Sequence, residues 1–265
     1  SAVPGQKPSQ AAVAPDLYRL LREQLNFDNP AAMAQHVCCH AGRAVNLMVN
    51  ARFQAKIAAA AKRVAGCRHF SANAKGFARG LIKILNDYAQ LLPGPGASWV
   101  CDGVRCLLTV PSVAAMHALI AILNDEFAGF LQFKNPFGEL DEAGRAARGH
   151  LLLCNITAVY EPENGTFREM LAWPTSGPAL EAMMAETASG QPAERWKRHV
   201  DAALELLRDP ALAGKQVAVA VEIQLTFDYF GVVRDAGHLN YDMVRPGKCG
   251  DLWRNFGGLE AEVEA

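Results

Sequence analysis

The sequence of 265 residues lacks an excess of charge, because 26 Lys and Arg residues balance 27 Asp and Glu residues and the formal net charge is −1. Such a chain has no global basic field, so we expect no duplex DNA partner, and any bound anion requires a local cluster of cations. The sequence also lacks an apolar run long enough to cross a bilayer and a recognisable signal peptide, so we expect no membrane partner. No internal repeat is visible.

A disulfide framework is absent as well. The seven cysteines are an odd number, and Cys101, Cys106 and Cys154 lie in apolar runs. This usage is typical of reduced, buried thiols, so we expect a cytoplasmic protein, a class that includes effectors and toxins delivered into a cell. His36 and His40 have the one-turn spacing of zinc ligands, but no third and fourth ligand follow at the usual spacing. Buried soft residues on a helix face are therefore the preferred interpretation.

Hydrophobic residues make up 51% and charged residues 20% of the chain, which is the balance of a globular protein that can bury a sizeable core as one large domain or two small ones. Helical and strand patterns alternate, which favours an α/β fold with a mixed sheet and helical flanks. The predicted helices are residues 16–26, 30–64, 113–127, 230–244 and two helices within 176–207. The predicted strands are residues 99–110, 150–160 and 215–227, and residues 133–138 are predicted as a loop.

The last of these strands contains a charged residue. Its Val-rich first half is typical of a strand that is buried on both faces, but Glu222 and Gln224 follow, two positions apart and hence on the same face of the sheet. Two interpretations are open. Glu222 lies at a strand end or an edge in water, which we would favour for an isolated Glu, or it is a carboxylate at the floor of a site, as a base or a metal ligand.

Lys75, Arg79 and Lys83 recur every four residues, so they form one stripe if this segment is a helix. The simple interpretation is a solvated helix face. The alternative is a cradle for a polyphosphate, supported by the dipole of the helix N-terminus. Downstream, His238, Tyr241 and Arg245 are three to four residues apart and hence share a face of the predicted helix 230–244.

The order of these features resembles the synthetase domain of the RelA/SpoT family, the alarmone synthetases. The resemblance runs from about residue 73 to residue 245 and includes, in order, the basic helix, an Asp-Gly-x-Arg strand, a Lys-Asn-Pro loop and a second strand. Its most specific part is Val221-Glu222-Ile223-Gln224, followed by His-x-x-Tyr-x-x-x-Arg at 238–245. Gly103-Val104-Arg105 matches the end of the Asp-x-x-Gly-x-Arg motif of the family.

The sequence departs from the family pattern at several positions. Val100 stands where the family has its magnesium-binding Asp, and Asp102 would point to the other face of a regular strand unless the strand is bulged. Asn73 stands where the family has an Arg, and Arg79 where it has a Ser. The Gly-Tyr-x-Ser-x-His acceptor loop of the family is not recognisable.

The resemblance implies a nucleotidyltransferase-like mixed β-sheet flanked by helices. In this interpretation residues 1–15 are a flexible lead-in, 16–66 a helical N-terminal region packed on the main domain, 67–246 the synthetase domain, and 247–265 a C-terminal tail. A helical insertion at about 165–212 precedes the Glu222 strand.

The family transfers the β,γ-diphosphate of ATP to a ribose 3′-hydroxyl, so the resemblance implies an ATP-dependent pyrophosphokinase that uses Mg²⁺. The acceptor would be a nucleotide, giving a ppGpp-, pppGpp- or ppApp-type product, or the 3′ end of tRNA. ATP binding is implied for four cations, Lys75, Arg79, Lys83 and Arg105.

The resemblance implies that Glu222 is the catalytic base and that Gln224 and His238 orient the acceptor. It also implies that Asp102 and Glu222 bind the metal ion. Acceptor binding is implied for Lys134, His150, Tyr241 and Arg245. His150 or Tyr160 would replace the missing aromatic platform.

Two further hypotheses remain open at the level of the sequence. The departures at Val100 and in the acceptor loop are those expected of a degenerate RelA/SpoT-like domain that binds a nucleotide or a partner protein without catalysis. Fold-level similarity alone would also admit another nucleotidyltransferase-like enzyme.

Overall fold

The computed structural model describes residues 30–76, 80, 100–135, 153–163, 165–188 and 193–229. These residues form a mixed α/β fold, as the alternation of helical and strand patterns predicted. The helices are α2 (Pro30–Ala61), α4 (Val113–Glu126), α7 (Phe167–Leu171), α8 (Ser176–Ala188), α9 (Ala193–Leu207) and α10 (Pro210–Ala213). The strands are β1 (Arg68–Ser71), β2 (Val104–Val110), β3 (Gln132–Lys134), β4 (Cys154–Tyr160) and β5 (Val219–Phe227).

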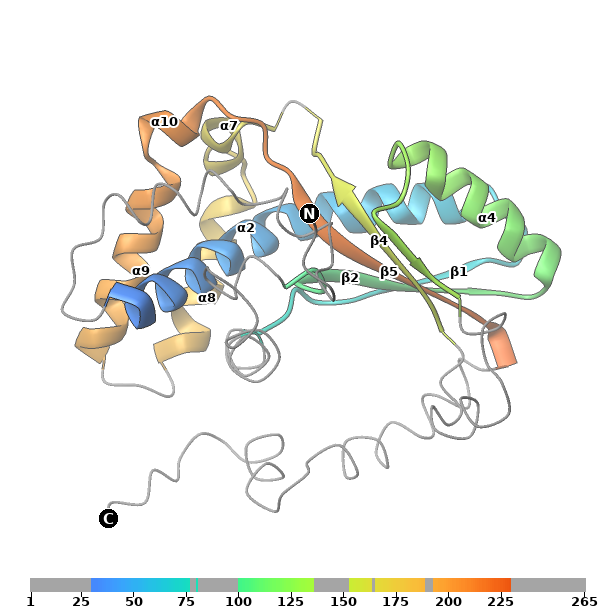
Figure 1. Cartoon of the computed structure of the whole chain (residues 1–265), viewed down its shortest axis with the longest axis horizontal. Helices are drawn as coiled ribbons and strands as arrows, with labels where there is room; N and C mark the ends of the chain where they lie inside the picture. Colours follow the sequence, from blue (N-terminus) through green and yellow to red (C-terminus); the bar gives the residue numbers. More distant parts are fainter. Residues whose placement is uncertain are drawn as a thin grey trace, which may run out of the picture.

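The strands form one open, five-stranded sheet in the order β1-β2-β5-β4-β3 (Figure 1). The central strand β5 is parallel to β2 and antiparallel to β4, whereas β1 and β3 pair antiparallel at the two edges. The sheet is therefore mixed, in agreement with the prediction. Because β5 has a strand on each side, its side chains are held between two neighbours.

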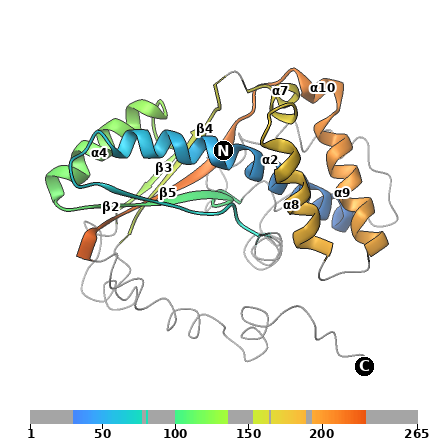
Figure 2. The same ribbon diagram turned by 180° about the vertical axis from the view of Figure 1, so that it is seen from behind.

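The long helix α2 runs across one side of the sheet, from α4 to the group of α8 and α9 (Figures 1 and 2). Its Phe53 is fully buried and meets the ring of Tyr160 edge-on, with 5.6 Å between ring centroids. Buried side chains of α2, α4, α9 and the sheet belong to a single hydrophobic cluster. The helix predicted for residues 30–64 is thus present, ends at Ala61, and contributes to the same core as the sheet.

The chain between β4 and β5 forms α7, α8, α9 and α10, which gather at one end of α2 (Figure 2). Helices α8 and α9 both contact α2, and His199 and Val200 of α9 are buried. The two helices predicted around Gly190 are confirmed as α8 and α9, whereas the short α7 and α10 were not predicted.

Several sequence predictions need correction. Residues 133–138 were predicted as a loop, but Phe133 and Lys134 belong to strand β3, and β1 was not predicted at all. Strands of three and four residues are too short to show an alternating pattern. The strand predicted to start at Trp99 starts at Val104. The helices predicted for residues 16–26 and 230–244 lie outside the described residues.

Among the described residues, no helix combines the length and the apolar character that a membrane span requires. The six cysteines in this part of the chain are free thiols; Cys106 and Cys154 are buried, as predicted, whereas Cys101 is half-buried. Burial raises the pKa of Cys154 to about 11 and that of Cys67 to about 11, so these thiols are poor nucleophiles at neutral pH.

Candidate functional site: the polar face of the sheet

The two faces of the sheet differ in chemistry. One face carries buried apolar side chains, such as Val104, Leu108, Ile156 and Ile223, and belongs to the core. The opposite face carries polar side chains of all five strands, and we call it the polar face. Its polar residues are Arg68, Arg105, Thr109, Gln132, Lys134, Asn155, Thr157, Glu222, Gln224 and Thr226.

Glu222 lies within the central strand of the sheet, not at an edge or a strand end. It is flanked in register by Arg105 of β2 and by Thr157 of β4, and it is half-buried. The amide nitrogen Nε2 of Gln224 donates to Glu222 Oε2 at 3.1 Å. The interpretation of Glu222 as a wetted strand end is therefore wrong. A carboxylate in this position is costly unless polar partners or a ligand offset its desolvation.

Two rows of side chains cross the polar face. Arg105, Glu222 and Thr157 occupy one row, and Gln224, Asn155 and Lys134 occupy the next. Adjacent strands are about 4.8 Å apart, so Arg105 stands one strand from Glu222, while exposed Lys134 stands two strands, roughly 10 Å, from Gln224. In these two rows the carboxylate of Glu222 lies between the cations Arg105 and Lys134, a distribution that suits a ligand with separated phosphate groups.

Lys75 and Asp102 form an ion pair near the start of β2. Lys75 Nζ donates to Asp102 Oδ2 at 2.6 Å, and each side chain is only 12% exposed. The main-chain N–H of Lys75 donates to the carbonyl of Gly103 at 2.8 Å. Asp102 lies in the turn before β2, so the pleat of the strand does not dictate its direction and no bulge is needed.

The prediction that Lys75 is part of a helical basic stripe is wrong. Residues 72–76 are neither helix nor strand, because the chain is bound there to the turn before β2. Among the described residues of this segment, the N–H of Gly80 donates to the carbonyl of Gly76, which is a helical hydrogen bond. Six other predicted site residues lie outside the described residues: Arg79, Lys83, His150, His238, Tyr241 and Arg245.

The expectation that Tyr160 supplies an aromatic platform is also wrong. Tyr160 is on the apolar face, is 5% exposed, and packs against Phe53 and Phe127 of the core. Its place at the end of β4 puts it in phase with Cys154 and Ile156, not with Asn155 and Thr157.

The residues proposed for Mg²⁺ are compatible with that ion but do not form an all-protein cage. The described part of the chain contains no cluster of three or more His, Cys, Asp or Glu side chains suited to a metal ion. Mg²⁺ commonly takes one or two carboxylates and completes its shell with water and phosphate oxygens, so either Asp102 or Glu222 could supply a carboxylate ligand. His40 is fully buried beside His199, with ring centroids 6.4 Å apart, as expected for core residues.

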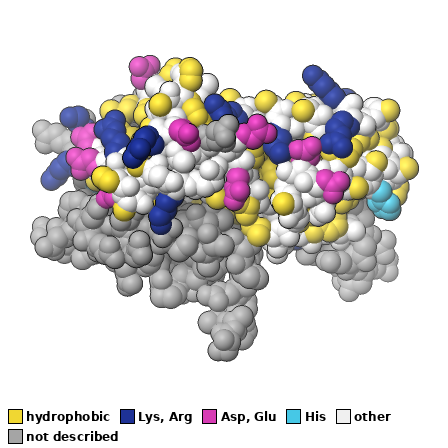
Figure 3. All heavy atoms as spheres, turned by 90° about the horizontal axis from the view of Figure 1, so that it is seen from above, with side chains coloured by type: hydrophobic (Ala, Val, Ile, Leu, Met, Phe, Trp, Pro, Cys, Tyr) yellow, Lys and Arg dark blue, Asp and Glu magenta, His cyan; other side chains and the backbone are white. Residues whose placement is uncertain are grey.

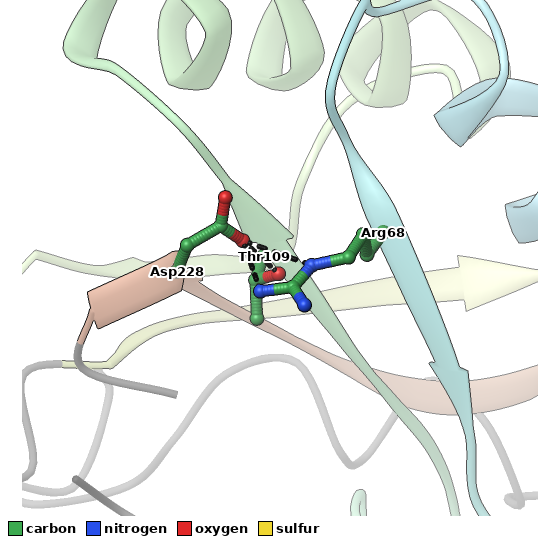
Figure 4. A network of polar contacts seen from close by, with 3 residues as sticks. All are labelled: Arg68, Thr109 and Asp228. Carbon is green, nitrogen blue, oxygen red and sulfur yellow. Dashed lines mark hydrogen bonds and ion pairs between the residues drawn. The ribbon is translucent and has the colours of Figure 1, made fainter. Parts of the chain in front are cut away.

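Sequence reasoning missed Asp228, which follows β5 directly. Its Oδ1 accepts hydrogen bonds from Thr109 Oγ1 at 2.5 Å and from Arg68 Nη2 at 2.7 Å (Figure 4). The bond from Thr109 and then that from Arg68 lower the pKa of the Asp228 carboxyl. This network ties β1 and β2 to the end of β5. The signal was in the sequence, because Glu222, Gln224, Thr226 and Asp228 alternate without interruption.

Asn155 and Thr157 of β4 were missed as well. Both flank the Glu222 strand, opposite Gln224 and Glu222 respectively. The Oδ1 atom of Asn155 is buried and accepts no hydrogen bond within the described structure. The same alternation could have identified them, but only the strand order brings them next to Glu222.

Comparisons with models of protein families, with curated proteins and with solved structures gave no match for this chain. In the view from above, positive and negative side chains of the described residues are mixed among apolar ones (Figure 3).

Proposed function

We propose that the protein is an ATP-dependent pyrophosphokinase that transfers the β,γ-diphosphate of ATP to the ribose 3′-hydroxyl of a nucleotide or of a tRNA end. The observation that carries this proposal is the position of Glu222, a half-buried carboxylate in the central strand with Arg105 opposite and Gln224 bound to it. A nucleotidyltransferase-like fold is part of the proposal. The mixed sheet with a central, Glu-bearing strand parallel to the Arg105 strand supports it.

On the donor side, Arg105 and Lys75 bind the phosphates of ATP. Arg105 presents a planar guanidinium that can form paired bonds to phosphate oxygens, and Lys75 is a point charge. Arg79 and Lys83 complete this group in the proposal. Mg²⁺, held by Asp102 and Glu222, supplies neutralisation of phosphate charge when bound.

On the acceptor side, Gln224 orients the ribose and Lys134 meets the phosphates of the acceptor nucleotide. The acceptor 3′-oxygen attacks the β-phosphorus, and its proton passes to the carboxylate of Glu222. The bond between the β-phosphorus and the α,β-bridging oxygen breaks, and AMP leaves with that oxygen and the electron pair. His238 also orients the acceptor in this proposal, and Tyr241 and Arg245 bind it.

The test is incubation with ATP, Mg²⁺ and a panel of guanosine and adenosine nucleotides and tRNA, with AMP as the measured product. We expect AMP release with at least one acceptor, and a loss of at least about 100-fold in the Glu222→Gln variant, as for a lost general base. If no acceptor gives AMP, or if Glu222→Gln is fully active, the proposal fails.

A second candidate is a nucleotide- or protein-binding module without catalysis. It is favoured by the enclosed Lys75–Asp102 ion pair, which occupies both a proposed phosphate ligand and a proposed metal ligand, and by Val100 in place of the family's Asp. This candidate predicts ATP binding that survives Glu222→Gln and no turnover with any acceptor.

A further inference from the structure

Helix α2 carries three amide side chains, Asn46, Asn50 and Gln54, at intervals of four residues and hence on one stripe of the helix. Gln54 is buried, and Asn46 and Asn50 are half-buried. We refer to these residues as the amide stripe. Such side chains inside a protein need hydrogen-bond partners, and here most of the partners are main-chain carbonyls of the sheet and its connections.

Gln54 and Asn50 bind main-chain carbonyls of strand β2 and of the connection that follows β1. Gln54 Nε2 donates to the carbonyl of Arg105 at 2.9 Å and to that of Ala72 at 3.3 Å. Asn50 Nδ2 donates to the same Ala72 carbonyl at 3.0 Å, and Asn50 Oδ1 accepts from Gln54 Nε2. One helix thus holds the strand that carries Arg105 and the connection that leads to Lys75.

The place of these bonds has a simple cause. The last pair between β1 and β2 is Ser71 with Cys106, so Ala72 and Arg105 are the next residues beyond the ladder. Their carbonyls need donors that no strand provides there, and the amide stripe supplies them. Because the Gln54 nitrogen donates, its Oε1 accepts from His69 Nε2 at 2.8 Å, and the Nε2 atom of His69 therefore carries the proton.

Asn46 contacts the third segment of the site. A Cβ atom built on Gly103 would lie 2.2 Å from Asn46 Nδ2, so the amide fills the space where a side chain would be. The carbonyl of Gly103 accepts the N–H of Lys75, and the neighbouring Asp102 binds Lys75 Nζ. A side chain at position 103 would therefore require the amide of Asn46 to move.

We propose that Asn46, Asn50 and Gln54 are positioning residues that fix the spacing of Lys75, Asp102 and Arg105 through their backbone. The inference rests on the proposed function only for the ligands that Lys75, Asp102 and Arg105 bind. The positioning itself is a property of the unliganded chain and can be measured without a nucleotide.

The first experiment is hydrogen exchange at the Lys75 amide. Gln54→Leu should accelerate this exchange about tenfold, because the hydrogen bond from the Lys75 N–H to the Gly103 carbonyl then breaks more often. Ser176→Ala is the matched control, because Ser176 is buried and donates to the Met170 carbonyl outside the polar face. The control should lower stability without changing exchange at Lys75.

The second experiment measures the coupling between Gly103 and Asn46. Gly103→Ala should accelerate exchange at Lys75 and weaken ATP binding about tenfold, because the Asn46 amide must leave the place that it occupies, and Asn46→Ala alone should also accelerate this exchange, because its contact with Gly103 is lost. In the double variant Gly103→Ala/Asn46→Ala the two effects should not add, since both act through one contact. This pair remains decisive if Gln54→Leu does not fold.

The outcomes separate the two proposals. If exchange at Lys75 responds as expected but the wild-type chain binds no ATP, the positioning stands and the proposed function fails. If Gln54→Leu matches Ser176→Ala in exchange and ATP affinity, or if Asn46→Ala leaves exchange at Lys75 as in the wild type, the positioning role is overturned.

Discussion

At the scale of single residues, Lys75 and Asp102 depend on each other because their ion pair is largely enclosed. Removing one partner leaves a charge in a site where water solvates it poorly, which costs more than removing both. We expect Lys75→Met to lower the free energy of unfolding by about 2 kcal/mol. The double variant Lys75→Met/Asp102→Asn should lose less than the sum of the single variants, with a coupling of about 1 kcal/mol or more. Urea unfolding of the four proteins measures this, and additivity within about 0.5 kcal/mol would contradict it.

Because of Asp228, we expect the free energy of unfolding to depend on pH in the acidic range. Its pKa is lower in the folded state than in the unfolded state, because it accepts bonds from Thr109 and Arg68. The unfolded state therefore takes up a proton first as the pH falls. The contribution of Asp228 to the free energy of unfolding is complete above the ordinary Asp pKa of 3.8, and it is lost as the pH falls through the lower pKa of the folded state. Asp228→Asn should be less stable than wild type near neutral pH, and the difference should shrink below about pH 4. A difference that stays constant down to about pH 2 would contradict this assignment.

The sequence predicted part of the site at this scale. Period-2 geometry correctly placed Glu222 and Gln224 on one face. It could not place Arg105 opposite Glu222, because that neighbour depends on the parallel register of β2 and β5, which no local pattern contains. The ion pair of Lys75 with Asp102 was missed for the same reason, since it requires the connection after β1 to meet the turn before β2.

At the scale of elements, helix α7 begins with a capping box. Thr166 Oγ1 accepts from the Glu169 N–H, and the Glu169 carboxylate accepts from the Thr166 N–H. The bonds from Thr166 lower the pKa of Glu169. Thr166→Ala should lower the free energy of unfolding by about 1 kcal/mol and leave ATP affinity unchanged, because α7 lies outside the polar face. Equal losses of stability and of ATP affinity would contradict this separation.

The elements also show where a local signal existed and where it did not. The sequence Thr166-Phe167-Arg168-Glu169 is a visible capping box, so α7 could have been predicted from it. Strands β1 and β3 could not, because they are edge strands of four and three residues whose pairing with β2 and β4 defines them. The long helices α2, α4, α8 and α9 were predicted because their segments are rich in Ala and other helix formers and are bounded by Pro or Gly.

At the scale of the whole molecule, the sheet and the helices between β4 and β5 share one hydrophobic cluster. Phe53 and Met48 of α2, Leu108 of β2 and Leu207 of α9 are all fully buried within it. We therefore expect unfolding to be a single transition. Leu207→Ala and Leu108→Ala should each lower the free energy of unfolding in this transition by about 2–4 kcal/mol. Circular dichroism and amide exchange in urea test this. Two separate transitions, with Leu207→Ala affecting only one, would contradict a shared core.

In the proposed reaction, the polar face transfers an intact diphosphate to a hydroxyl group with Glu222 as the base. The most direct measurement follows the label from ATP carrying ³²P at the γ-position in the presence of Mg²⁺ and each acceptor. We predict that the label moves to the acceptor together with the β-phosphate, that AMP appears in equal amount, and that Glu222→Gln abolishes both while ATP binding remains. Release of ADP instead of AMP, or label transfer that is unchanged in Glu222→Gln, would contradict it.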